Sequence, residues 1–170
     1  ANRGKELTAL DENIKCGNSL IDDPNIAGDK AFNWFLSFPS VFRNYRKPKT
    51  PDVQTNDIQE PSYNYGNPES KGYEKFGFDV VIGNPPYVSA NNMTFAEREF
   101  FNNESKFKTL SGKWDLYIPF IERSLSLLKH KGKQCFIIPF GLLNQPFGVK
   151  LRKLILDEFR IQSIVDLRDI

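Results

Sequence analysis

The sequence has few of the residues from which many catalytic centres are built. It contains one histidine, His130, and two cysteines, Cys16 and Cys135, which stand far apart in the chain. A single histidine excludes histidine-based metal and triad chemistry, and no CxxC pair indicates a metal site. We therefore predict no metal. We expect His130 to be solvated at a helix end, and the cysteines to be buried thiols or a disulfide in a chain that resides in a reducing cytoplasm.

Long apolar runs and a strong net charge are also absent. No hydrophobic stretch approaches the roughly 20 residues that cross a bilayer, so no membrane partner is predicted. The net charge of +2 is too small to indicate nucleic-acid binding by itself, although a local basic patch could still bind it.

A polar stretch from Asn44 to about Lys75 is rich in Pro, Asn, Lys, Ser and Tyr and has almost no aliphatic residues. Such a stretch buries too little apolar surface to offset the entropy of ordering it. We interpret it as a long surface insertion, partly disordered. The basic run "RNYRKPK" at its start, residues 43–49, is either solvated or in contact with phosphates.

Outside this insertion, strand patterns alternate with helix patterns. The run "FDVVI" is nearly all apolar and β-branched, which predicts a parallel strand covered on both faces. We expect Trp34 and Phe38 to pack their segment onto the sheet, Asp115 to cap a helix that ends near Gly132, and Lys150, Arg152 and Lys153 to form a charged helix face. The expected elements are a strand at 14–16, a short helix or hooked loop at 30–42, a strand at 78–82, a helix at about 115–131, a strand at 134–139, a helix at 148–159 and a strand at 161–167.

This order is typical of an α/β fold with a parallel sheet and crossover helices. Ligands of such sheets bind outside the carboxyl ends of the strands. The strand at 78–82 therefore directs the segment Asn84–Tyr87 toward a ligand site.

The segment Asn84-Pro85-Pro86-Tyr87 is a stiff group of neutral hydrogen-bond acceptors beside an aromatic ring. Proline fixes its own φ and holds the preceding residue extended, and neither proline has an N–H group. Two neutral acceptors that bind the N–H groups of an amine on a flat ring would make that amine a better nucleophile, and the tyrosine ring would stack on its base. Because the amine attacks as a neutral group, the electrophile must already be activated, as a sulfonium methyl is. The alternative interpretation is an ordinary surface turn.

With these residues, the chain resembles the amino-methyltransferases that use S-adenosylmethionine, whose motif is [DNS]PP[YFW]. Segments in the same order resemble the N6-adenine DNA methyltransferase module of type IIG restriction–modification enzymes. They are "NIKCGNSLI", "FNWFLSFPSVF", "GFDVVIGNPPYV", "KWDLYIPFIERSLSLLKHKG", "FIIP" and "KLRKLILDEFRIQSIVDL".

The resemblance implies a role for each motif residue. The Asn84 side chain and the Pro85 carbonyl would accept hydrogen bonds from the adenine N6 amine, and Tyr87 would stack on the flipped-out base. Pro86 would lie against the cofactor S-adenosylmethionine. Gly17 and Asn18 would lie near the cofactor adenine, although Asn18 also fits an ordinary turn that ends a strand.

The resemblance also implies that residues 1–170 form a partial methyltransferase domain. The fold would be a doubly wound, mostly parallel Rossmann-like methyltransferase sheet that is incomplete, because the cofactor-binding strands at the amino-terminal end are absent. No GxG occurs in the sequence, so we expect this piece alone to bind cofactor poorly and to be inactive, and its exposed sheet edge could form a dimer.

The implied function is site-specific methylation of adenine N6 in double-stranded DNA, in a prokaryotic cytoplasm, by the full-length enzyme. Two alternatives remain open. Methyltransferases that act on protein glutamine or on RNA use the same kind of motif, and the chain could also be a non-catalytic scaffold half.

Overall fold

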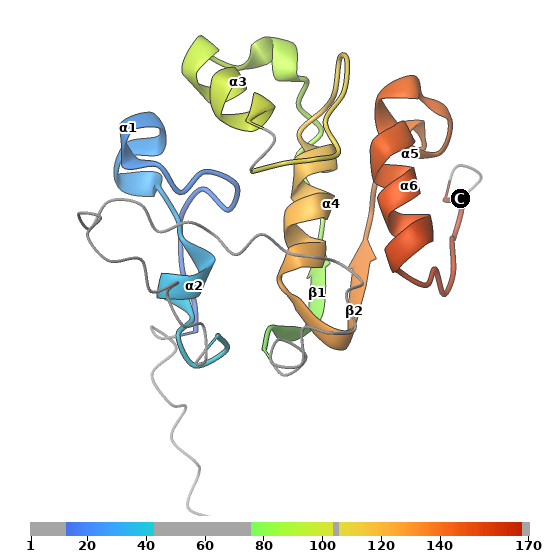
Figure 1. The fold of residues 1–170 in the computed structure, drawn as a ribbon, viewed down its shortest axis with the longest axis horizontal. Helices are drawn as coiled ribbons and strands as arrows, with labels where there is room; N and C mark the ends of the chain where they lie inside the picture. Colours follow the sequence, from blue (N-terminus) through green and yellow to red (C-terminus); the bar gives the residue numbers. More distant parts are fainter. Residues whose placement is uncertain (1–12, 43–75, 104–105, 168–170) are drawn as a thin grey trace, which may run out of the picture. The chain divides into compact units, whose positions relative to one another are not determined.

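The computed structural model describes residues 13–42, 76–103 and 106–167 (Figure 1). These fall into two units, within Ala1–Tyr45 and Arg46–Ile170. The predicted insertion at 44–75 and the basic run at 43–49 lie outside the described residues. Among the described residues, no helix has the length and apolar character that crossing a membrane requires.

The first unit is a small structure around an aromatic cluster. Its elements are α1 (Pro24–Ala27), the 3-10 helix η2 (Gly28–Lys30) and α2 (Trp34–Ser37). The rings of Trp34 and Phe38 stack at 5.7 Å, and Phe32 meets Trp34 edge-on at 5.1 Å. Trp34 also donates its indole N–H to the carbonyl oxygen of Ser19. The hooked segment of the prediction is therefore confirmed, whereas packing of its aromatic residues onto the sheet stays a prediction.

The predicted strand at 14–16 is wrong. These residues form no ladder with any described residue, and Ile14 is exposed. In the described part of this unit the only pairing is a single parallel bridge between Asn18 and Ala31. An apolar residue in a short segment does not form a strand unless a neighbouring strand supplies hydrogen bonds.

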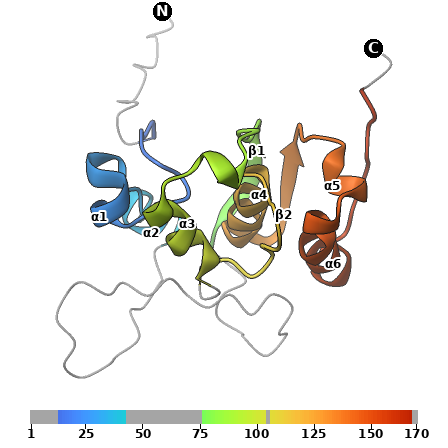
Figure 2. The ribbon, with the colours of Figure 1, turned by 90° about the horizontal axis from the view of Figure 1, so that it is seen from above.

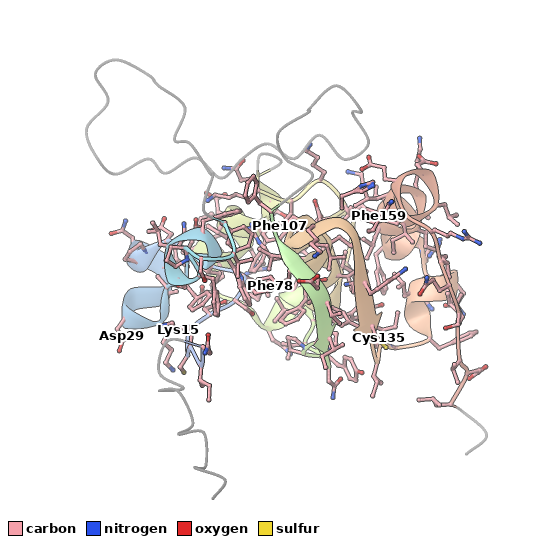
Figure 3. The ribbon with its side chains drawn as sticks, turned by 90° about the horizontal axis from the view of Figure 1, so that it is seen from below. Lys15, Asp29, Phe78, Phe107, Cys135 and Phe159 are labelled. Atoms are coloured by element: carbon pink, nitrogen blue, oxygen red, sulfur yellow. The ribbon has the colours of Figure 1, made fainter. Side chains whose placement is uncertain are left out.

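The second unit is built on a two-stranded parallel sheet, β1 (Phe78–Gly83) beside β2 (Leu128–Phe136). Phe78 at the start of β1 and Cys135 near the end of β2 are labelled in Figure 3. The register pairs Ile82 with Cys135 and Gly83 with Phe136. The carboxyl ends of both strands therefore meet at the same edge of the sheet, as predicted. This confirms the α/β class and parallel pairing in the residues described, and the fold is compatible with a partial methyltransferase sheet.

The helix α4 (Tyr117–Ser126) covers one face of this sheet (Figures 1 and 2). Phe120 of α4 packs on Phe136 of β2 with ring centroids 5.8 Å apart. The buried residues of the unit gather on α4 and on the segments that precede it: Ala90, Phe100, Phe101, Phe107, Trp114, Tyr117, Ile118, Ile121, Leu125 and Leu127. Nine of the ten residues of α4 are buried, including Glu122, Arg123, Ser124 and Ser126, so the helix is enclosed on nearly all sides rather than along one apolar stripe.

The ends of this helix differ from the prediction. The cap residue is Leu116 and makes no side-chain cap hydrogen bond, so Asp115 is not the cap. The helix ends at Ser126 because β2 already begins at Leu128. His130 lies in an irregular turn of β2 rather than at a helix end, and it is exposed as expected.

The opposite face of the sheet is exposed, which corrects the expectation of a strand covered on both faces. Val80 and Ile82 of β1 are 55% and 74% exposed, and Ile137 is 58% exposed. In the described residues of this unit, α4 lies against the other face, where Phe136 points. Cys135 shares the bare face, so it is exposed, and Cys16 is exposed as well. Both cysteines are free thiols, so the predicted burial and the disulfide are wrong.

The segment between β1 and α4 forms η3 (Ala90–Asn92) and α3 (Phe95–Asn102), which the sequence prediction missed. Thr94 and Glu97 form a capping box at the start of α3, in which each side chain accepts from the other residue's backbone N–H. The pattern Thr-x-x-Glu was a readable signal for this helix.

After β2 come α5 (Gly141–Asn144), the 3-10 helix η4 (Pro146–Gly148) and α6 (Val149–Glu158). Leu151 is fully buried. Arg152, expected on a charged helix face, instead donates to the carbonyl oxygens of Leu142 and Gln145. The predicted strand at 161–167 is wrong, because these residues form no ladder with any described residue, and Ile164 and Val165 are exposed. A segment with strand composition becomes a strand only when it forms hydrogen bonds with a neighbouring strand.

Candidate functional site

The segment Asn84–Tyr87 follows β1 directly and lies at the carboxyl end of the sheet, as the sequence predicted. Pro85 is buried, whereas Asn84, Pro86 and Tyr87 are exposed. A buried proline in the middle anchors the segment, and its polar and aromatic neighbours face outward. We call these four residues the corner.

The corner is held at its start by the next strand. The N–H of Ile137, which follows β2, donates to the carbonyl oxygen of Gly83 at 3.3 Å. This bond extends the parallel ladder by one residue beyond β2. The entry to the corner is therefore fixed relative to both strands.

The corner is held at its far side by a short antiparallel pairing with the segment before α4. Leu116 donates to the Val88 carbonyl at 2.8 Å, and Ala90 donates to the Trp114 carbonyl at 3.1 Å. Ser89 and Asp115 are the bridge partners between these two bonds. Because Trp114 is buried, this pairing ties the exit of the corner to the core.

Tyr87 is 53% exposed, and its hydroxyl group donates to the carbonyl oxygen of Ile137 at 2.9 Å. The ring therefore lies between the ends of β1 and β2 and keeps exposed surface. An aromatic ring in this state is suited to stacking on another flat ring.

The Asn84 side chain is exposed and makes no hydrogen bond to any residue that the structure describes. Its amide oxygen and the main-chain carbonyls of the two prolines are neutral acceptors. None of the four residues of the corner carries a charge at neutral pH. The arrangement is suited to binding N–H donors of an uncharged amine rather than an anion.

Gly17 and Asn18, the other predicted cofactor residues, lie in the first unit. Asn18 Oδ1 accepts from the backbone N–H groups of Leu20 and Ile21 at 3.1 and 3.2 Å, so the side chain forms a local turn. The Phe32 ring lies 2.6 Å from the position where a side chain at Gly17 would begin, so only glycine fits there. The turn alternative for Asn18 is thus observed, and the cofactor role of both residues stays a prediction.

A buried carboxylate that sequence reasoning missed fixes the loop in front of α4. Glu122 of α4 accepts from the backbone N–H groups of Lys108 and Thr109 at 2.8 and 3.1 Å, and from the Thr109 hydroxyl at 2.5 Å. Three donors satisfy the carboxylate, which compensates its burial. The readable signal was an acidic residue on the apolar face of a predicted helix.

Tyr117 of α4 is 1% exposed, and its hydroxyl group has no hydrogen-bond partner among the described residues. Burial, and secondarily the charge of Asp115, raises the pKa of Tyr117 to about 12, although Arg152 opposes the shift. Burial disfavours the charged phenolate, and a nearby carboxylate disfavours it further. Tyr117 therefore stays neutral at physiological pH.

No group of His, Cys, Asp and Glu side chains suited to a metal ion occurs in residues 13–42, 76–103 and 106–167. A shallow cavity of about 280 Å³ lies between the loop Ser111–Lys113 and the residues Pro146 and Phe147.

Comparison with known proteins identifies the family. Residues 1–170 match the Eco57I restriction-modification methylase family, and the chain belongs to it. The chain is 29% identical over 160 residues to the type II restriction enzyme and methyltransferase RM.Eco57I of Escherichia coli. It is 38% identical over 95 residues to the type II methyltransferase M.BstVI of Geobacillus stearothermophilus, and 38% identical over 92 residues to the type II methyltransferase M.XhoI of Xanthomonas vasicola.

These relatives are much longer than the chain. The match to RM.Eco57I covers 94% of this chain and 13% of the relative. The matches to M.BstVI and M.XhoI cover 55% and 54% of this chain, and 16% of each relative. The predicted resemblance to a methyltransferase module of type II restriction–modification enzymes is thereby confirmed at the level of the family.

Proposed function

We propose that the protein transfers a methyl group from S-adenosylmethionine to the N6 amine of an adenine in double-stranded DNA, as the modification activity of a restriction–modification enzyme. The observation that carries this proposal is the corner itself. Neutral acceptors and a half-exposed aromatic ring are fixed together at the carboxyl end of a parallel sheet, where α/β proteins bind ligands. Relatives named as type II methyltransferases support the same reaction.

The residues of the corner have separate roles in this proposal. The Asn84 amide oxygen and the Pro85 carbonyl oxygen accept the two N–H groups of the amine, which directs its lone pair away from the ring. Tyr87 stacks on the base that has left the duplex, which offsets part of the cost of unpairing it. The amine needs no prior deprotonation, and its extra proton passes to water after the transfer.

The corner is compatible with a contact to S-adenosylmethionine through its exposed proline. Pro86 is exposed beside the acceptors and offers an apolar contact with no N–H group. When bound, S-adenosylmethionine supplies a methyl group already activated by its sulfonium charge. The contact of Gly17 and Asn18 with the cofactor adenine remains a prediction from the resemblance, and the Oδ1 atom of Asn18 is already engaged in the local turn.

The partner would be double-stranded DNA and the compartment a prokaryotic cytoplasm. Lys113 is exposed on the segment that leads into α4. Ser89, just after the corner, pairs with Asp115, and Lys113 lies two residues before Asp115 in the chain. Positive charge beside a base-binding site favours the phosphate backbone.

The proposal is tested with the complete encoded protein and S-adenosylmethionine that carries a tritium-labelled methyl group. Double-stranded DNA, RNA and a glutamine-containing peptide are offered separately, and incorporated label is counted. We expect label in DNA alone. Label in RNA or in peptide glutamine would replace this function with one of the two rival methyltransferase activities, and no label in any acceptor would indicate a non-catalytic scaffold.

A further inference from the structure

The hydroxyl group of Tyr87 is tied to the neighbouring strand across 50 residues of sequence. Oη donates to the carbonyl oxygen of Ile137 at 2.9 Å. The N–H of Ile137 in turn donates to the carbonyl oxygen of Gly83, one residue before the corner. Ile137 thus binds the corner twice, once through the backbone at its start and once through the ring at its end.

This hydrogen bond restrains the side-chain torsions of Tyr87, which the backbone pairing leaves free. The antiparallel pairing of Val88–Ala90 with Trp114–Leu116 fixes the main chain after the corner but not the side-chain torsions of Tyr87. The ring is half exposed, so packing alone constrains it weakly. A bond from the far end of the ring to a ladder residue holds both its position and its tilt.

We propose that the Tyr87–Ile137 hydrogen bond is a positioning device that sets the plane on which the target base stacks in front of Asn84. The inference rests on the proposed function and assigns the hydroxyl group a task separate from the stacking done by the ring. A ring held before the base arrives loses less rotamer freedom on binding. It also presents the amine to the acceptors in one orientation, and small misplacements of a reacting group cost much of its rate.

The test is the substitution Tyr87→Phe in the complete encoded protein, with DNA methylation measured in steady state. The phenyl ring keeps its stacking surface and loses only the donor. We expect kcat to fall roughly three- to tenfold, the effect of one hydrogen bond, while KM for DNA stays within about twofold. Tyr87→4-aminophenylalanine supplies an N–H donor at the same place and should restore most of the lost rate.

The matched control is Tyr117→Phe, which removes a hydroxyl group that has no hydrogen-bond partner among the described residues. Its kcat should equal that of the wild type.

A spectroscopic readout separates positioning from mere stabilisation of the fold. With 2-aminopurine as the target base, the short-lifetime fluorescence component that reports stacking should shrink in Tyr87→Phe and return in Tyr87→4-aminophenylalanine.

Two failures are distinguishable. If the wild type methylates DNA and Tyr87→Phe has the same kcat and the same lifetimes, the positioning role is wrong and the proposed function stands. A loss in Tyr87→Phe that 4-aminophenylalanine does not restore also contradicts it. If the wild type transfers no methyl group to DNA, the proposed function fails and the positioning role fails with it.

Discussion

Asn84 combines an exposed amide with a main chain held from both sides. The Ile137 and Leu116 hydrogen bonds fix the backbone around the corner. The Asn84 side chain is exposed, so it contributes little to packing. Its removal should therefore affect chemistry without affecting the fold.

We predict that Asn84→Ala lowers kcat for DNA methylation by about 10²–10³, the usual effect of removing one preorganised hydrogen-bonding group from an active site. The unfolding temperature should stay within about 1 °C of the wild type, since an exposed side chain without contacts adds little stability. Steady-state kinetics and a thermal melt of the same preparation check this. A fall in activity accompanied by a large fall in the unfolding temperature would argue for a structural role instead.

Glu122 is the opposite case, a buried charge with three donors and no contact with the corner. We predict that Glu122→Gln destabilises the protein by about 1.5–3 kcal/mol, because the NH2 group that replaces one carboxylate oxygen would face the N–H of either Lys108 or Thr109, donor against donor. Chemical denaturation measures the free energy of unfolding.

The matched control for this change is Glu97→Gln in the capping box of α3. Its carboxylate accepts from the backbone N–H of Thr94 at the surface, and glutamine performs the same role in capping boxes. We expect a change below about 0.5 kcal/mol. Equal costs for the two substitutions would contradict the account of Glu122.

At the scale of elements, the irregular start of the parallel pair depends on one glycine. Gly77 precedes β1 with φ of +122°, and a side chain there would lie 2.5 Å from the backbone nitrogen of Lys129 in β2. Gly112 also has positive φ, +61°, but a side chain there would meet nothing within 4 Å.

We predict that Gly77→Ala costs at least about 3 kcal/mol, because backbone strain adds to a clash with backbone that cannot move aside. Gly112→Ala should cost about 1–2 kcal/mol from the conformation alone. Denaturation of both variants compares clash plus strain with strain alone. Similar losses would show that the close approach of Gly77 to β2 is not what constrains it.

The sequence predicted elements best where local pattern and burial agree. The helix from Tyr117, the strand from Phe78 and the position of the corner follow from apolar spacing and from the prolines. The corner could be placed because a strand end and a proline pair are both local signals. The role of the Tyr87 hydroxyl could not, since its partner Ile137 lies 50 residues away.

The errors have a common physical cause. A strand needs a partner, and residues 14–16 and 161–167 have strand composition without one among the described residues. Burial likewise depends on what lies opposite. Cys135 has an apolar neighbourhood in sequence, but it is on the bare face of the sheet.

At the scale of the whole molecule, the stability should depend on alkaline pH through Tyr117. Its pKa is raised from 10.0 to about 12, so the folded state favours the neutral phenol. The stabilisation relative to the unfolded chain is complete below pH 10 and is lost as pH rises from 10 to 12, by up to about 3 kcal/mol. Denaturation midpoints measured between pH 9 and 12 check this, with Tyr117→Phe showing a shallower decline. An equal decline in both proteins would contradict the assignment.

The matched segments cover 13–16% of the length of these relatives, so the reaction is a property to be measured on the complete encoded protein. The family assignment covers residues 1–170 and is independent of the corner's geometry. The central claim is narrower, namely that the corner binds one exocyclic amine of one base.

That claim is tested most directly by identifying the methylated atom. DNA is incubated with the complete protein and S-adenosylmethionine carrying a ¹³C-labelled methyl group, digested to nucleosides and analysed by mass spectrometry. The account predicts labelled N6-methyl-2′-deoxyadenosine from the wild type and its loss in Asn84→Ala. Label on a carbon atom of any base, or undiminished N6-methyladenine formation by Asn84→Ala, would contradict it.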